Sequence, residues 1–365
     1  MVNGPNGLRR AVEKLLPEFY PLHSGLTTGT CATAAAVAAA IRLWQNETPD
    51  EVPVILPNGE TITVPVGYAD GYAYCIKDAG DDPDVTDGIE IRAHVEKAEQ
   101  FKILGGEGVG RFTLPGFDFP PGEAAINKAP REMIRQNVEA LTIDHSPLTI
   151  DHSSLAITIS VPNGAAIAQR TFNPRLGIEG GISIIGVSGI VKPVSEEAFI
   201  DSIRKCMTVA QVSGTERVVI NSGGKSERFV KALYPTLPQQ AFVEYGNYIG
   251  ETLKIAHELN IKNVTLGVML GKAVKLAQGH LDTHSKKATM DKDLIRQLLQ
   301  EAGCEIDISD ITLARELWER IPEFRQIPFA QTVIRHCHEH CDALLPNGEL
   351  TILLIDDNGK IYETV

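Results

Sequence analysis

The pattern of hydrophobic and polar residues changes about halfway along the chain. Up to about residue 190, short alternating segments typical of half-buried strands are interspersed with a few helical segments. Beyond residue 190, apolar runs alternate with amphipathic stretches, as in parallel strands joined by crossover helices. We therefore predict an α+β domain over residues 1–190 and an α/β domain with a small parallel sheet over residues 191–365.

The first half contains the clearest local signals. An amphipathic segment over residues 8–16 precedes a loop and an alanine-rich stretch. Alanine has the highest helix propensity, so a helix is predicted from Cys31 to about Leu43, with Thr30 as its N-cap. Two alternating runs flank a turn at residues 57–59 and predict a hairpin.

Composition narrows the range of partners. The chain of 365 residues has a formal net charge of −13, whereas nucleic-acid binders are usually rich in lysine and arginine. Its six cysteines are too sparse for a disulfide framework. No signal peptide is evident, and no apolar run approaches the roughly 20 residues of a membrane span. We expect a cytoplasmic protein without nucleic-acid or membrane partners, and we leave homo-oligomerisation open.

A threonine-rich motif, Thr27-Thr28-Gly29-Thr30, precedes the first predicted helix. A helix N-terminus offers free N–H groups and the positive end of the helix dipole, and hydroxyls add donors. The motif therefore predicts an anion site, with plain capping of the helix by Thr30 as the alternative.

An acidic loop carries four carboxylates between Lys77 and Asp84. Such a density of like charge requires a cation, a ligand dipole or a basic neighbour nearby. The spacing does not match that of calcium-binding loops, and a solvated turn is the alternative interpretation. An anionic ligand in so acidic a chain would need cations that are clustered locally.

Residues 219–226 combine the end of an apolar strand, a glycine turn and a helix start. A phosphate-binding loop would need glycine five positions before the Gly224-Lys225 pair, where Val219 stands. What remains is a glycine turn at the carboxyl end of a predicted parallel strand, and open α/β sheets bind ligands at such places.

Two other motifs have simple explanations. Residues 336–341 contain three histidines and two cysteines, and the pairs His336/His340 and Cys337/Cys341 are four positions apart, as metal ligands on a helix can be. Both cysteines fall on the apolar stripe, so buried thiols with surface imidazoles are favoured, and no resident metal is predicted. The repeated Thr-Ile-Asp-His-Ser segment over residues 142–153 is interpreted as a loop insertion, because adjacent side chains do not converge as a catalytic triad does.

Five segments, in order along the chain, carry a resemblance to one known family. They are residues 24–32, 77–86, 120–127, 171–191 and 271–285. In this combination the chain resembles the cobalt-precorrin-5B C1-methyltransferases, the CbiD family of anaerobic cobalamin synthesis. It departs from the family pattern at Val268-Met269, where Gly-His is expected, and at Asp282, where Asn is expected. The first departure excludes any role for that imidazole here.

The resemblance implies both a fold and an activity. The N-terminal half would be a permuted version of the ribosomal protein S5 domain 2 fold, followed by a four-stranded parallel α/β domain. The reaction would transfer a methyl group from S-adenosylmethionine to C1 of cobalt-precorrin-5B and give cobalt-precorrin-6A. Cobalt would enter only as part of the tetrapyrrole substrate.

This hypothesis assigns the tetrapyrrole to the first domain and the methyl donor to the second. The substrate-binding candidates are Thr27, Thr28, Thr30, Arg175 and Lys192. The cofactor-binding candidates are Ser222, Gly223, Gly224, Glu227, Tyr245, Gly246 and Asn247. Candidates for proton transfer or orientation are Asp81, Asp82 and His284.

The expected mechanism is an in-line displacement in which placement of two ligands and exclusion of water matter most. One alternative is a small-molecule kinase that uses the threonine motif and Gly224-Lys225-Ser226 on nucleotide phosphates. The other is a non-catalytic tetrapyrrole or metal carrier that uses residues 336–341. Stabilisation by S-adenosylhomocysteine, by ATP, or by cobalt or zinc alone distinguishes the three.

Overall fold

The computed structural model describes residues 22–141, 155–284 and 290–363. The chain divides into two compact units, unit 1 over residues 1–195 and unit 2 over residues 196–365. The predicted boundary at residue 190 lies close to this division. The amphipathic segment 8–16 and the repeat at 142–153 lie outside the described residues.

Unit 1 is built on a five-stranded mixed sheet in the order β4-β5-β6-β9-β7. Its strands are β4 (Gly67–Ala69), β5 (Tyr72–Ile76), β6 (Glu90–Lys97), β9 (Leu155–Ser160) and β7 (Lys102–Gly105). Strand β7 runs parallel to β9, and the other neighbours are antiparallel. Three two-stranded pairs complete the unit: β2 (Glu51–Ile55) with β3 (Thr61–Pro65), β1 (Gly25–Leu26) with β11 (Ile190–Val191), and β8 (Arg111–Phe112) with β10 (Ile178–Glu179).

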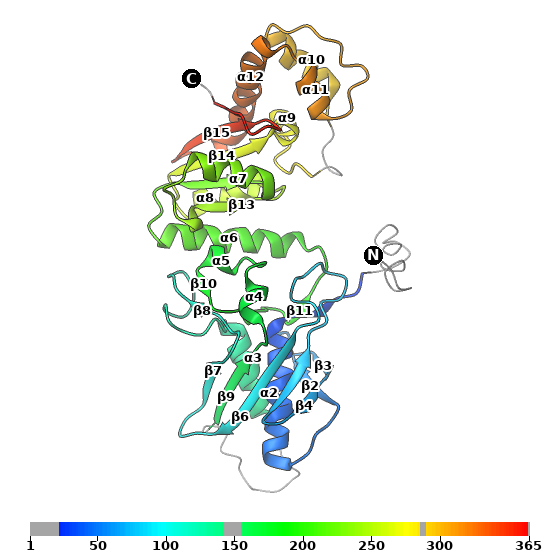
Figure 1. The fold of residues 1–365 in the computed structure, drawn as a ribbon, viewed down its shortest axis with the longest axis vertical. Coiled ribbons are helices and arrows are strands. Elements are labelled where there is room, and N and C mark those ends of the chain that lie inside the picture. The colour runs from blue at the N-terminus through cyan, green and yellow to red at the C-terminus, as the bar shows by residue number, and fades with distance from the viewer. Residues whose placement is uncertain (1–21, 142–154, 285–289, 364–365) are drawn as a thin grey trace. The chain divides into compact units, whose positions relative to one another are not determined.

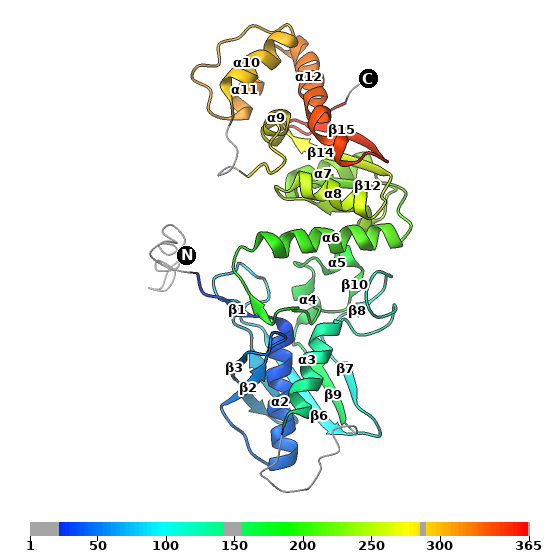
Figure 2. The same cartoon turned by 180° about the vertical axis from the view of Figure 1, so that it is seen from behind.

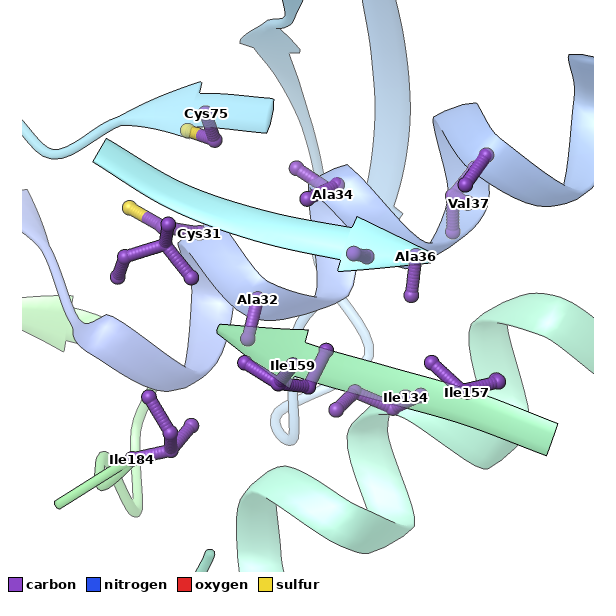
Figure 3. Close-up of a cluster of buried hydrophobic side chains, with 14 of the residues drawn as sticks. Cys31, Ala32, Ala34, Ala36, Val37, Cys75, Ile134, Ile157, Ile159 and Ile184 are labelled. Carbon is purple, nitrogen blue, oxygen red and sulfur yellow. The ribbon is translucent and has the colours of Figure 1, made fainter. Parts of the chain in front are cut away.

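Two helices, α2 (Thr28–Gln45) and α3 (Lys128–Glu139), cover one face of this sheet (Figures 1 and 2). The alanines of α2 let its backbone approach the strands closely, and nearly the whole helix is buried. Figure 3 shows Ile157 and Ile159 of β9 and Ile134 of α3 in the same cluster as these alanines. Two short helices follow, α4 (Gly164–Ala168) and α5 (Asn173–Leu176).

Helix α2 begins before the predicted start at Cys31. Its N-cap is Thr27, whose hydroxyl accepts a hydrogen bond from the N–H of Thr30 at 3.1 Å. The prediction of Thr30 as the N-cap was wrong, because all three threonines are equally good capping residues by type and the pattern does not choose among them. Thr30 lies inside the first turn instead.

Unit 2 contains a five-stranded sheet in the order β13-β12-β14-β15-β16. The strands are β12 (Val218–Asn221), β13 (Phe242–Glu244), β14 (Asn263–Met269), β15 (Glu349–Ile355) and β16 (Ile361–Tyr362), of which only β16 is antiparallel to its neighbour. The helices are α6 (Glu196–Val212), α7 (Gly224–Leu233), α8 (Ile249–Glu258), α9 (Leu270–Ala277), α10 (Lys292–Glu301), α11 (Ala314–Arg320) and α12 (Glu323–Cys341), with 3₁₀ turns η1 (Gln239–Ala241) and η2 (Asp342–Leu344).

The predicted parallel sheet with crossover helices is therefore present, and the molecule is a mixed α/β protein. The likeness of unit 1 to ribosomal protein S5 stays a prediction. Within the described residues, no helix combines the length and apolar character needed to cross a bilayer.

Strand β12 lies between β13 and β14 in the sheet. The chain leaves β12 through α7 to reach β13 on one side, and then passes through α8 to β14 on the other side. Such a reversal of direction opens a crevice at the carboxyl ends of the strands, where open α/β sheets bind their ligands. The residues that follow β12, β13 and β14 therefore form the candidate site in unit 2.

Candidate functional site

The turn after β12 requires glycine at position 223. Gly223 has φ = +85°, and a Cβ atom there would lie 2.3 Å from Oε1 of Glu244. Its N–H donates to the side-chain oxygen of Asn221 at 2.8 Å, and the hydroxyls of Ser222 and Ser226 lie 2.9 Å apart. The turn is thus held in one conformation, with its backbone against a carboxylate.

That carboxylate was not singled out from the sequence. Glu244 ends β13, directly beside Asn221 of β12, and follows the glycine turn by about 20 residues. An acidic residue at this place in an α/β sheet accepts hydrogen bonds from ribose hydroxyls in dinucleotide-binding proteins. The predicted Glu227 lies in the first turn of α7, is buried, and pairs with the ammonium of Lys231 at 2.6 Å. The geometry favours Glu244 for such a role.

The predicted loop at Tyr245, Gly246 and Asn247 follows β13 and is held from α9. Nζ of Lys272 donates to Gly246 O at 2.7 Å and to the side-chain oxygen of Asn247. The side chain of Tyr245, in contrast, is fully buried, and its hydroxyl donates to Gly267 O at 3.3 Å. Burial raises the pKa of Tyr245. We infer that this loop can meet a ligand through its backbone and Asn247 rather than through the tyrosine ring.

Lys272, like Glu244, belongs to the candidate site but was not predicted as a site residue from the sequence. Besides the loop, it reaches the Thr283 hydroxyl at 3.3 Å. Burial, assisted by neighbouring Lys275, lowers the pKa of Lys272 to about 8, while Asp282 opposes the shift. The folded protein therefore holds this proton less tightly than the unfolded chain, and raising the pH from about 8 to about 10 removes a cost to stability.

His284 lies at the end of the same assembly. The N–H of Thr283 donates to Asn247 O at 3.0 Å, and the N–H of His284 donates to the Asp282 carboxylate at 3.1 Å. The 281–284 segment is thereby tied to the loop after β13. In unit 2 the structure brings together the glycine turn, Glu244, the 245–247 loop, Lys272 and this segment at one edge of the sheet.

In unit 1 the three threonines hold the chain segment 183–189 against α2. The Thr30 hydroxyl donates to Gly189 O at 2.6 Å, and the Thr28 hydroxyl accepts from the N–H of Ile185 at 2.8 Å. All three threonines are buried, and the N–H of Gly29 is taken by Ile185 O at 2.9 Å. These groups are already satisfied within the protein, which weakens their case as direct contacts to a substrate.

Thr30→Val is expected to destabilise the fold and to leave tetrapyrrole binding unchanged. The substitution keeps the shape of the side chain but removes the shorter of two hydrogen bonds to buried Gly189 O, whose other donor is the N–H of Thr27 at 3.1 Å. Loss of one such bond costs about 0.5–1.5 kcal/mol. Urea unfolding measures the loss, and Thr63→Val, on the exposed face of β3, is the matched control. A stable Thr30→Val protein with weakened tetrapyrrole binding would instead support the substrate-contact hypothesis.

The acidic loop is an ordered structure. Asp81 accepts from the N–H of His23 at 2.7 Å, and Asp82 accepts from the N–H of Val194 at 3.0 Å. Burial works to raise the pKa of Asp84, but hydrogen bonds from Thr86 and from buried Lys77 outweigh it and lower the pKa. Donors within the protein therefore relieve the charge repulsion, and catalytic roles for Asp81 and Asp82 stay predictions.

Arg175 and Lys192 are the remaining candidates in unit 1. Arg175, on α5, is partly buried, with its guanidinium 5.8 Å from the ring centre of Phe172. Lys192 follows β11 and is exposed. Their roles toward a substrate stay predictions.

The histidine- and cysteine-containing end of α12 is packed as predicted. Cys337 and Cys341 are fully buried, and all six cysteines are free thiols. His336 and His340 line a pocket of about 630 Å³ together with His280. Across residues 22–141, 155–284 and 290–363, no three histidine, cysteine or acidic side chains converge as a metal-ligand set. The structure gives the metal-carrier alternative no support.

Comparison with known proteins covers both units. The family model described as CbiD matches residues 17–193, and that of the CbiD C-terminal domain matches residues 282–364. A "Cobalt-precorrin-5B C(1)-methyltransferase" from Prosthecochloris aestuarii is 39% identical over 349 residues, which are 92% of this chain and 94% of the relative. The protein of the same name from Brucella canis is 44% identical over 362 residues, 96% and 97% of the two chains.

One solved structure is also similar. It is the cobalamin biosynthesis protein (cbiD) from Archaeoglobus fulgidus, which is 29% identical in sequence. The alignment covers 73% of this chain and 83% of that chain, with a TM-score of 0.41. The similarity to known proteins therefore rests chiefly on the sequence relatives, which span nearly the whole chain.

Proposed function

The chain belongs to the CbiD family, and from this premise we propose that it methylates C1 of cobalt-precorrin-5B. The donor would be S-adenosylmethionine and the product cobalt-precorrin-6A. The observation that carries the proposal is 39–44% identity to cobalt-precorrin-5B C(1)-methyltransferases over more than nine-tenths of the chain. Cobalt is part of the substrate in this reaction.

The donor site that we propose is the carboxyl edge of the unit 2 sheet. The absence of a Cβ at Gly223 lets the Glu244 carboxylate lie directly against the turn. A carboxylate there can accept hydrogen bonds from both ribose hydroxyls of an adenosine, as in other nucleoside sites of α/β sheets. Asn247, held by Lys272, supplies a further amide on the same edge. The residues present therefore fit an adenosine-containing donor.

For methyl transfer, the main task of the protein is to position the donor and the tetrapyrrole relative to each other. When bound, S-adenosylmethionine supplies a methyl group on a sulfonium, and the electron pair of C1 displaces the sulfur. The glycine turn and Glu244 hold the nucleoside, and Lys272 fixes the loop that borders it. No covalent protein nucleophile is needed, and alignment with exclusion of water supplies the rate enhancement. Asp81, Asp82 and His284 remain our candidates for orienting groups or moving a proton.

The kinase alternative has little support from the turn. Val219, where a phosphate-binding loop needs glycine, is buried inside β12. Nζ of Lys225, the residue that would reach the phosphates, pairs with the Asp357 carboxylate at 3.1 Å. The side chain of Lys225 is therefore engaged at the end of β15 rather than folded over the turn.

Glu244→Gln is expected to weaken binding of S-adenosylhomocysteine by roughly tenfold or more. Hydrogen bonds to a charged group contribute about 1.5–3 kcal/mol, and each 1.4 kcal/mol is a factor of ten in affinity. Isothermal titration calorimetry measures the change, and Glu227→Gln, on the neighbouring helix, is the matched control. A loss in the Glu227 variant alone would return the role to the residue that the sequence predicted.

The reaction itself is tested with isotopically labelled donor. Purified protein is incubated with cobalt-precorrin-5B and S-adenosylmethionine that carries ¹³C in its methyl group. We expect label at C1 of the macrocycle and release of S-adenosylhomocysteine. Folded protein that binds both compounds and yields no labelled macrocycle would contradict the proposed activity.

A further inference from the structure

A second pocket, of about 450 Å³, lies in unit 1 between the edge strand β7, the loop before α3, and α3 itself. Its lining combines basic, aromatic and aliphatic side chains. They are Phe101, Lys102, Ile103, Leu104, Phe119, Glu123, Lys128, Arg131, Glu132 and Arg135. The pocket adjoins residues 120–127, one of the five segments that carry the family resemblance.

The charge of this pocket is opposite to that of the whole chain. Four of the lining side chains are cationic and two are acidic, in a protein whose net charge is −13. Clustered cations of this kind are what an anionic ligand needs in an otherwise acidic molecule. The side chains of Lys102 and Lys128 are exposed, and the contact of Lys128 with Glu132 is a long surface ion pair of 3.8 Å, so both ammonium groups can turn toward a ligand.

The two arginines are built into the pocket wall. Arg131 donates to Ile126 O at 2.8 Å, and its guanidinium lies 4.3 Å from the ring centre of Phe119. Arg135 lies 4.1 Å from the ring centre of Phe101. The other donors of Arg131 go to Ile103 O and Ala124 O, so this arginine shapes the wall of the pocket. Arg135, whose contact with Glu139 is long at 3.6 Å, is held over its ring with donors that can meet a carboxylate. Leu104, 44% exposed, adds apolar surface beside these cations.

We propose that this pocket binds one edge of the tetrapyrrole, with its cations on the carboxylate side chains and its apolar surface against the ring. The inference rests on the proposed function, which supplies a macrocycle that carries several carboxylates. The threonine motif, which was the predicted anion site of unit 1, cannot take this role, because the Thr27, Thr28 and Thr30 hydroxyls are engaged within the protein. The pocket offers the locally clustered cations that the threonine motif does not.

Binding of uroporphyrin, a tetrapyrrole with acetate and propionate side chains, tests the proposal by fluorescence titration of the full chain. Lys102→Glu/Lys128→Glu is expected to raise the Kd by at least about tenfold. Lys97→Glu/Arg170→Glu, which makes the same charge change at exposed positions outside the pocket, is expected to stay within about twofold of wild type. Equal affinities for the two variants would overturn the inference, because they would show that only overall charge matters.

Methyl transfer separates this inference from the proposed function. With cobalt-precorrin-5B, the pocket variant is expected to show a KM raised about tenfold with kcat within about twofold of wild type. A wild-type KM in the pocket variant would remove the pocket from substrate binding and leave the methyltransferase activity standing. A wild-type protein that transfers no methyl group would contradict the activity itself, whatever the uroporphyrin titration shows.

Discussion

Gly223→Ala is expected to weaken binding of S-adenosylhomocysteine by at least about thirtyfold. The added methyl group would lie 2.3 Å from Oε1 of Glu244, so the turn or the carboxylate must move. In addition, φ = +85° with ψ = 176° is a conformation that is essentially restricted to glycine and costs an L-residue roughly 1–3 kcal/mol. Both effects displace the same two groups that we assign to the ribose. The loss of affinity should therefore exceed that of Glu244→Gln.

Gly214→Ala separates the collision from the backbone strain. Gly214 has φ = +72°, and no heavy atom of the described chain lies within 4 Å of an added Cβ there. Calorimetric titration of both variants, with thermal unfolding to confirm the fold, is the measurement. Gly214→Ala should bind the ligand as wild type does, with a modest loss of stability. Wild-type affinity in a folded Gly223→Ala protein would remove the glycine turn from the donor site.

Lys272→Met is expected to lower kcat/KM by roughly a hundredfold. The ammonium group donates to Gly246 O, Asn247 and Thr283, and its removal leaves these oxygens without a shared donor. An unsatisfied polar group in a partly buried site costs about 1–3 kcal/mol, and the loop beside Glu244 would relax to recover it. Steady-state kinetics with saturating tetrapyrrole measures the effect. Lys275→Met, which removes a single bond to Thr283 O, should cost far less.

The effect of Lys272→Met on activity is expected to decrease as the pH rises. Burial lowers the pKa of Lys272 to about 8, so the charged form is present below that pH and is lost as the pH rises through it. The ratio of wild-type to Lys272→Met activity should therefore be largest near pH 7 and decrease above pH 8. A ratio that stays constant from pH 7 to pH 9 would show that the charge of Lys272 has no part in the effect.

Much of the architecture follows from the sequence. The alanine-rich stretch packs as a buried helix because its side chains are small, and the apolar runs after residue 196 form a parallel sheet because they alternate with amphipathic helices. The exact start of α2 does not follow, since Thr27 and Thr30 have the same capping ability. The positions of the unit 1 threonine hydroxyls depend on residues 183–189, which are more than 150 positions away.

The site in unit 2 shows where sequence reasoning ends. The glycine turn is visible as a local pattern, and so is Glu227 beside it. Glu244 lies about 20 residues further on, and only the register of β12 with β13 shows that it stands next to the turn. That spacing from a glycine turn to an acid at the end of the next strand is a signal that could have identified it. Lys272 was visible as a family residue, but its three contacts arise only from tertiary structure.

A crystal structure of the full chain with S-adenosylhomocysteine tests the proposed donor site most directly. We predict the nucleoside at the carboxyl edge of the unit 2 sheet, with its ribose hydroxyls within hydrogen-bond distance of the Glu244 carboxylate and its backbone contacts at Gly223. An ordered ligand bound within unit 1, with Glu244 and the glycine turn untouched, would contradict this account.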